Sequence, residues 1–257
     1  MNGSPSSGAY DVIGAGYTRT RRADARIAAR IHRHLGAAPT VVNVGAGAGS
    51  YEPTDRHVVA VEPSAEMVRQ RPPSAAPVLR ASAEALPFPA QSFAAGTALL
   101  TVHHWPDALA GLAELRRVTR GPIVVFTFDH EVHGTQWLVT DYLPSMLELD
   151  TTMPSPGAIA EALGGGIVEV LPVPHDCTDG FCHAWWRRPD AYLDPTVRAG
   201  ISGIARLPAA VVDEAMARLA DDLAGGRWQA AHADLLGRDE IDAGYRLVVA
   251  DPIDARA

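Results

Sequence analysis

The sequence predicts an α/β protein built on a mainly parallel sheet, with a ligand-binding site at one edge of that sheet. Three observations lead to this prediction. Short apolar runs alternate with amphipathic segments through the first half of the chain, and this strand–helix–strand order favours parallel pairing. One run, residues 41–44, continues directly into a glycine-rich turn at residues 45–49. The next run, residues 58–61, ends on a carboxylate, Glu62.

The glycine turn and Glu62 together indicate which ligand the site binds. Gly45, Gly47 and Gly49 permit positive φ, so the backbone can approach a ligand closely at the start of a helix. A dinucleotide site would have glycine or alanine at the position that Ser50 occupies here. The spacing therefore disfavours a pyrophosphate. Glu62 stands where a carboxylate accepts hydrogen bonds from both hydroxyls of a ribose.

The amphipathic and apolar segments follow each other in a regular order. Ile27, Ile31 and Leu35 share one face of a helix that is expected over residues 23–36. Strands are expected at about residues 40–45, 57–61, 77–80, 95–101, 122–128, 167–173 and 245–250, with further helices near residues 64–70 and 106–118.

The composition fits one folded domain, residues 1–257. A chain of 257 residues can bury a single large core, so one domain with an insertion is expected. The formal net charge of −8 disfavours nucleic acid as a partner, because neutralising phosphates needs a concentrated basic face. No apolar run approaches the ~20 residues of a membrane span, and the first residues do not resemble a secretory signal. We therefore expect a cytoplasmic protein without membrane contact.

A long connection separates the last two predicted strands. Residues 181–240 contain a helical run at residues 208–223, preceded by clustered aromatic and cationic side chains. Connections of this length in a compact domain usually carry function or form a lid. The segment is interpreted as a helical insertion that covers the substrate.

Four segments of the chain carry a resemblance to a known family: the glycine turn and residues 81–93, 99–107 and 114–128. Together they resemble class I S-adenosylmethionine-dependent methyltransferases, most closely the small-molecule enzymes related to quinone methylases (methyltransferase type 11). Residues 81–93 resemble the adenine-contacting loop of that family. Residues 99–107 resemble the end of its fourth strand, and residues 114–128 its next helix and strand. The resemblance covers roughly residues 10–130.

The resemblance implies a Rossmann-like fold with seven strands, the last inserted antiparallel beside the sixth. It also implies methyl transfer from S-adenosylmethionine to a small-molecule acceptor, in a bacterial biosynthetic pathway. Two alternatives keep the fold: a cyclase or isomerase that uses the cofactor without transferring its methyl group, and a cofactor-binding protein without turnover. A nicotinamide dehydrogenase is a more distant alternative. The expected protein is a monomer or a homodimer.

The resemblance also assigns the cofactor site. Its expected residues are Tyr17, Arg21, Asn43, Gly45, Ala46, Gly47, Gly49, Glu62, Pro63, Ser82, Ala83, Thr101 and Val102. An N-terminal lid, residues 1–36, would close Tyr17 over the methionine end and pair Arg21 with its carboxylate; an exposed arginine-rich helix entry is the alternative. The chain departs from the family pattern at Asn43 and Ser82, where the family usually has acidic residues.

The acceptor site is expected beyond the fourth strand. His103 and His104 lie there, and one of them is a candidate proton acceptor, although such a pair also serves simply to shape a pocket. Five aromatic residues are candidates for contacts with the acceptor: Trp137, Tyr142, Phe181, Trp185 and Trp186. Two of these, Trp185 and Trp186, could equally seal the insertion onto the sheet.

No metal site is expected from the sequence. Cys177 and Cys182 are interpreted as free thiols. His175, Asp176 and His183 lie nearby, but the spacings are wider than the paired spacings of ordinary zinc sites.

Overall fold

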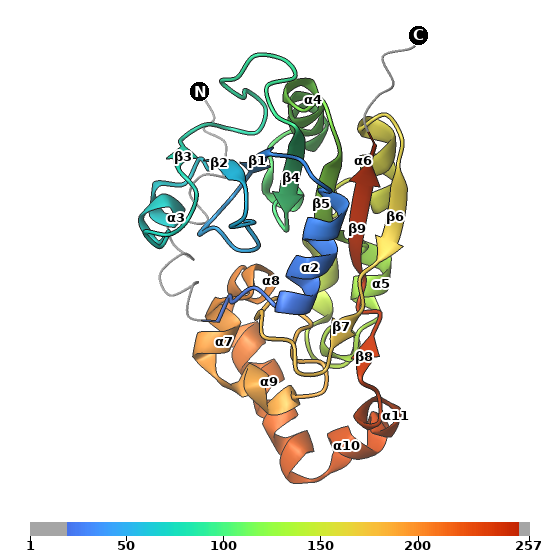
Figure 1. The fold of residues 1–257 in the computed structure, drawn as a ribbon. Helices are drawn as coiled ribbons and strands as arrows, with labels where there is room; N and C mark the ends of the chain where they lie inside the picture. The colour runs from blue at the N-terminus through green and yellow to red at the C-terminus, as the bar shows by residue number, and fades with distance from the viewer. Residues whose placement is uncertain (1–19, 252–257) are drawn as a thin grey trace.

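The computed structural model describes residues 20–251, which form a seven-stranded sheet in the order β3-β2-β1-β4-β5-β9-β6 (Figure 1). Tyr17 and the first half of the expected lid lie outside the described residues. The strands of this sheet are β1 (Thr40–Val44), β2 (His57–Val61), β3 (Val78–Leu79), β4 (Ala95–Leu99), β5 (Ile123–Phe128), β6 (Ile167–Val170) and β9 (Tyr245–Ala250).

The final strand has the predicted place and direction. β9 pairs antiparallel with β5 on one side and with β6 on the other, while the pairs that β1 to β5 form among themselves are all parallel. Every residue of β9 is buried, because strands flank it on both sides and helices cover the sheet. The predicted mainly parallel sheet is confirmed.

Side chains of alternate strand residues form two separate cores, one on each face of the sheet. Val41 packs with Ile27 and Ile31 of helix α2 (Ala25–His34), and Val42 packs with Leu112 of helix α4 (Ala108–Val118). Successive side chains of a strand point to opposite faces, which explains why two neighbouring valines belong to different cores. Helix α6 (Pro156–Ala162), which was not predicted, packs with α4.

The strand expected over residues 167–173 is divided in the structure. β6 ends at Val170, and β7 (Val173–Pro174) pairs with β8 (Glu240–Ile241) in a separate two-stranded sheet. Pro172 and Pro174 lack an N–H to donate, which limits continuous pairing through this segment. The expected single strand is therefore wrong beyond Val170.

The β7–β8 pair joins the two ends of a helical lobe, seen below the sheet in Figure 1. After β7 come η5 (Pro189–Leu193), α7 (Pro195–Ala199), α8 (Ser202–Ala205), α9 (Ala209–Ala224), α10 (Arg227–Ala231) and α11 (Ala233–Leu236). Their core includes Trp228, Leu219 and Tyr192.

A second segment of the chain, between β5 and α6, also contributes to the lobe, and it was not predicted from the sequence. After β5 the chain forms α5 (His130–Gly134), the π-helix η3 (Leu138–Tyr142) and the 3-10 helix η4 (Pro144–Glu148). Trp137, Leu138 and Leu143 from this segment pack into the same core as Trp228. Within residues 20–251, no helix combines the length and apolar character needed to span a membrane.

Candidate functional site

Two adjoining cavities open at the carboxyl ends of β1, β2, β4 and β5. The larger, about 280 Å³, is bordered by the glycine turn and by Glu62, and we call it the cofactor cavity. The smaller, about 70 Å³, lies between the sheet and the helical lobe, and we call it the acceptor cavity. Arg21, Leu100 and His104 line both. A group bound in one cavity is therefore adjacent to a group bound in the other.

The glycine turn follows β1 in a conformation that requires glycine. Gly45, Gly47 and Gly49 have φ values of 68°, 52° and 96°. A Cβ atom on Gly45 would also lie only 2.0 Å from the hydroxyl oxygen of Thr101. Gly45 is thus restricted both by its own backbone and by the end of β4 beside it.

Glu62 holds the turn in place from the end of β2. Its Oε2 accepts a hydrogen bond of 2.8 Å from the N–H of Gly47, and its Oε1 one of 2.9 Å from the N–H of Ser64. Ser64 in turn caps helix α3 (Ala65–Arg69) by accepting from the N–H of Met67. Burial raises the pKa of Glu62, and the two N–H groups act against that shift. Each carboxylate oxygen keeps a lone pair for a further donor.

Asn43 has a role that its sequence position did not reveal. Its Nδ2 donates to Oε1 of Glu52 at 3.1 Å, and its Oδ1 accepts from the hydroxyl of Thr97. Glu52 forms a buried ion pair of 2.8 Å with Arg71, whose guanidinium also donates to the carbonyl of Gly47. An aspartate at position 43 would place a second negative charge beside Glu52. The amide of Asn43 instead donates to that carboxylate.

Most of the other predicted cofactor residues border the cofactor cavity. They are Ala46, Pro63, Ser82, Ala83 and Thr101. Ser82 donates from its hydroxyl to the carboxylate of Glu84, and Ala83 is buried against helix α4. Gly49 and Val102 do not line the cavity, and Val102 packs into the core beneath it.

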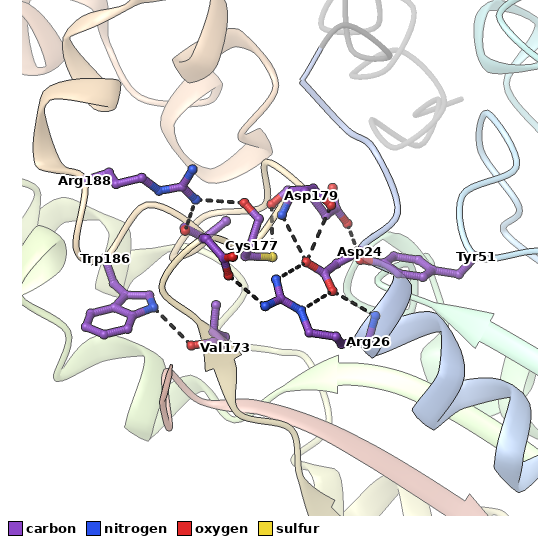
Figure 2. Close-up of polar contacts among 11 residues, drawn as sticks. Asp24, Arg26, Tyr51, Val173, Cys177, Asp179, Trp186 and Arg188 are labelled. Atoms are coloured by element: carbon purple, nitrogen blue, oxygen red, sulfur yellow. Dashed lines mark hydrogen bonds and ion pairs between the residues drawn. The ribbon is translucent and has the colours of Figure 1, made fainter. Parts of the chain in front are cut away.

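Arg21 is positioned by the start of the helical lobe. Its Nε donates to Oδ1 of Asp179 at 2.6 Å, and both side chains are almost completely buried. The hydroxyl of Tyr51 donates to the other oxygen of Asp179, a contact drawn in Figure 2. The carboxylate of Asp179 thus already faces the guanidinium that was expected to bind the cofactor carboxylate. Arg21 nevertheless borders both cavities.

His103 and His104 lie side by side on a short 3-10 helix, η2 (Val102–His104), directly after β4. Their ring centroids are 3.8 Å apart. His104 borders both cavities, whereas His103 borders the acceptor cavity and packs against Phe128. Burial lowers the pKa of His103 to about 4 and lowers that of His104 as well. Both rings are neutral at pH 7, and the lowered pKa makes each of them a better hydrogen-bond acceptor than a proton acceptor.

The five aromatic candidates for acceptor binding lie in different places. Phe181 lines the acceptor cavity. The indole N–H groups of Trp137 and Trp186 donate to backbone carbonyls in the core, and Tyr142 donates to Asp222 on the surface of the lobe. Trp185 stacks beneath Arg188, 4.3 Å from its guanidinium. The structure therefore brings one of the five to the cavity. Trp137 and Tyr142 pack the core of the lobe, Trp186 packs into the sheet core on the α2 side, and Trp185 contacts both cores.

Several residues lining the acceptor cavity were missed. They include His130, His133, Asp150, Cys182 and Tyr245. His130 and His133 follow β5 closely in the chain. Polar residues at the carboxyl end of a parallel strand often indicate a ligand-binding site. Asp150, Cys182 and Tyr245 reach the cavity only through the packing of distant segments.

Comparison with known proteins agrees with this geometry. The family model described as a methyltransferase domain matches residues 42–122, which contain the glycine turn, Glu62 and the adenine-loop segment. No curated protein matches the chain. A solved structure from Anabaena variabilis, assigned as a methyltransferase of an antibiotic biosynthesis pathway, is 31% identical. The alignment covers 90% of this chain and 98% of that one, with a TM-score of 0.83.

Other solved structures match at lower identity. The geranyl diphosphate C-methyltransferase of Streptomyces coelicolor, solved with Mg²⁺, geranyl diphosphate and S-adenosyl-L-homocysteine, is 16% identical. The alignment covers 89% of this chain and 79% of that one, with a TM-score of 0.48. The identity and coverage of the Anabaena protein, together with the matching domain, define the family: this chain belongs to the class I S-adenosylmethionine-dependent methyltransferases.

Proposed function

We propose that the cofactor cavity binds S-adenosylmethionine and that the enzyme methylates a small molecule in the acceptor cavity, as a step of a biosynthetic pathway. The observation that carries this proposal is Glu62. Its buried carboxylate is fixed by the N–H groups of Gly47 and Ser64 and faces the cavity with free lone pairs. Two neighbouring ribose hydroxyls are donors of the matching kind. The biosynthetic role is also the one assigned to the Anabaena relative.

The adjoining cavities suit methyl transfer. The reaction is an in-line displacement at the methyl carbon: the acceptor atom forms the new bond, and the sulfonium takes the electrons of the broken carbon–sulfur bond. Such a step depends mainly on holding donor and acceptor in line at close range. His104 borders both cavities, so its neutral imidazole is placed to accept a hydrogen bond from an acceptor group near the methyl carbon.

The acceptor that fits best is a largely apolar molecule with a hydroxyl or amine donor at the reacting end. Phe128, Phe181 and Met146 supply apolar wall, and His103 and His104 supply neutral acceptors.

The test begins with cofactor binding. Glu62→Gln removes the charge that receives the ribose hydroxyls, and hydrogen bonds to charged groups contribute about 1.5–3 kcal/mol. We expect calorimetry to show S-adenosylmethionine affinity reduced roughly 10–100-fold. Glu161→Gln, at an exposed position of α6, is the matched control and should bind as the wild type does. Equal affinities in the two variants would contradict the assignment of the site.

Methyl transfer itself is tested by incubating the enzyme with methyl-labelled cofactor and a metabolite extract. A labelled product formed in equal amount to S-adenosylhomocysteine supports the proposal. Conversion of a metabolite without S-adenosylhomocysteine would instead favour a cyclase or isomerase that retains the methyl group on sulfur. Cofactor binding with no metabolite consumed would favour a protein without turnover.

A further inference from the structure

Three side chains with metal-binding atoms meet at the wall of the acceptor cavity. His133 comes from α5, whereas Cys182 and His183 come from the segment that leads into the helical lobe. One potential ligand atom from each residue lies within 4.8 Å of the others. The rings of the two histidines are 4.0 Å apart, measured between their centroids.

Both histidines have a buried ring nitrogen without a hydrogen-bond partner among the described residues. These atoms are Nδ1 of His133 and Nε2 of His183. Buried polar atoms are nearly always paired, so two unpaired nitrogens in one cluster need an explanation.

We propose that His133, Cys182 and His183 form a three-ligand site for a divalent transition metal of the zinc type. Two imidazole nitrogens and one thiolate are a donor set that suits zinc and disfavours magnesium or calcium, which prefer oxygen ligands. Three protein ligands with an open fourth position are typical of catalytic zinc sites. This assignment differs from the sequence expectation of no metal, because His133 is 49 positions before Cys182 and is not part of any local ligand spacing.

The geometry requires only a small adjustment. With metal–ligand distances of about 2.0–2.3 Å, a tetrahedral site separates its donor atoms by about 3.3–3.8 Å. The separations of up to 4.8 Å would therefore close by roughly 1 Å, which a change in side-chain torsion supplies. His133 and Cys182 line the acceptor cavity, so the open position would face a bound acceptor.

The open fourth coordination position gives the metal a role in methyl transfer if the proposed function holds. An oxygen, nitrogen or sulfur atom of the acceptor would occupy the fourth position, where the metal favours the deprotonated, nucleophilic form. Metal binding itself does not depend on this role and is tested separately.

Cobalt(II) provides a direct probe, because it replaces zinc and its spectrum reports the ligands. We expect metal-stripped protein to bind one cobalt ion per chain. The spectrum should show a thiolate-to-cobalt charge-transfer band together with the visible bands of a tetrahedral centre, and zinc should remove both. A wild-type spectrum without the charge-transfer band, or binding well below one ion per chain, would overturn the proposal.

Two cysteine variants make the assignment specific. Cys182→Ser should abolish the charge-transfer band. Cys177→Ser should keep it, because the Cys177 sulfur contacts the carbonyl of Asp179 in a different cluster, shown in Figure 2. Identical spectra for the two variants would overturn the proposal. His183→Gln should weaken cobalt binding roughly 10–100-fold or more, since losing even an outer partner of a ligand has an effect of that size.

Calorimetry with S-adenosylmethionine on the same proteins separates this proposal from the proposed function. Cys182→Ser should bind the cofactor as the wild type does, because Cys182 does not line the cofactor cavity. If the wild type gives the expected cobalt spectrum but does not bind S-adenosylmethionine, the proposed function alone is contradicted. If the wild type binds S-adenosylmethionine but does not give the expected cobalt spectrum, the metal site alone is contradicted.

Discussion

At the scale of single residues, the cofactor cavity depends on Gly45 and Glu62, and replacing either residue is expected to weaken cofactor binding. Gly45 combines a positive φ with a Cβ direction occupied by Thr101. Glu62 combines burial with two backbone donors. These two positions were found from the sequence because the chain alone fixes what they need: a glycine where a strand turns, and a carboxylate where the next strand ends.

We expect Gly45→Ala to weaken S-adenosylmethionine binding more than tenfold, because the new methyl group would collide with Thr101 and displace the turn. Calorimetry measures the loss. Gly36→Ala is the control: Gly36 also has a positive φ, of 54°, but a Cβ there meets nothing within 4 Å. That variant should lose some stability and keep its cofactor affinity. Similar losses of affinity in both variants would show that backbone strain alone is responsible.

The raised pKa of Glu62 predicts a pH dependence of cofactor binding. A carboxyl group with a raised pKa takes up its proton at a higher pH than the ordinary value of 4.5. The protonated group is a poorer acceptor for ribose hydroxyls, so affinity should fall as the pH decreases toward that raised value. Calorimetry at a series of pH values measures this, with Glu62→Gln expected to show no such fall. A wild-type affinity that stays constant down to pH 4.5 would contradict the prediction.

At the scale of elements, α2 and the start of the lobe are joined by a buried acidic group. Asp24 caps α2 by accepting from the N–H of Arg26, and its other oxygen accepts from the N–H of Thr178 (Figure 2). Burial alone would raise the pKa of Asp24, but the hydrogen bonds from Arg26 and Thr178 outweigh it and lower the pKa to about 2. This carboxylate connects segments that are more than 150 positions apart in the chain.

Asp24→Asn keeps an effective helix cap but removes the charge. The lowered pKa predicts that the charge stabilises the fold above the ordinary pKa of 3.8, by roughly 2 kcal/mol. This stabilisation should disappear as the pH falls through about 2. Urea unfolding at pH 7 and at lower pH measures the difference between wild type and variant.

Asp55→Asn is the matched control for Asp24→Asn. Asp55 also pairs with an arginine, but its side chain is 67% exposed. Solvent screens such pairs, so the control should change stability much less. A difference between wild type and Asp24→Asn that is the same at pH 7 and below pH 3 would contradict the charge-based account.

Element positions were predicted well where local pattern determines them. The continuous run of buried residues in β1 and the spacing of Ile27 and Ile31 on α2 are properties of neighbouring residues, and both elements formed within two residues of the expected bounds. The strand after α6 was only partly predicted, because its division after Val170 depends on β8, which is 70 positions later and supplies the partner of β7. Helix α6 itself was missed.

At the scale of the whole molecule, ligand binding should stabilise the fold as a unit, since the cofactor cavity draws residues from the sheet, the N-terminal segment and the loops between them. At a concentration 100 times the dissociation constant, a ligand adds about 2.7 kcal/mol. For a chain of this size that corresponds to a rise of about 5–10 °C in Tm. Thermal unfolding with S-adenosylhomocysteine measures the shift.

Glu62→Gln at the same ligand concentration is the control, and it should show a much smaller rise in Tm. A shift that persists undiminished in this variant would place the ligand elsewhere in the protein. No shift in the wild type would contradict the proposed cofactor site directly.

The sequence by itself determined the sheet, the glycine turn and the acid that follows it, because each depends on residues adjacent in the chain and on backbone geometry. Tertiary structure alone decided which side chains face the acceptor. Trp137 and Trp186 are buried in cores of the protein and Phe181 lines the cavity, although all three are large and apolar. His133 lies close to Cys182 and His183 because α5 and the segment that leads into the lobe pack together. Contacts between distant segments depend on how helices pack, and no local pattern records that.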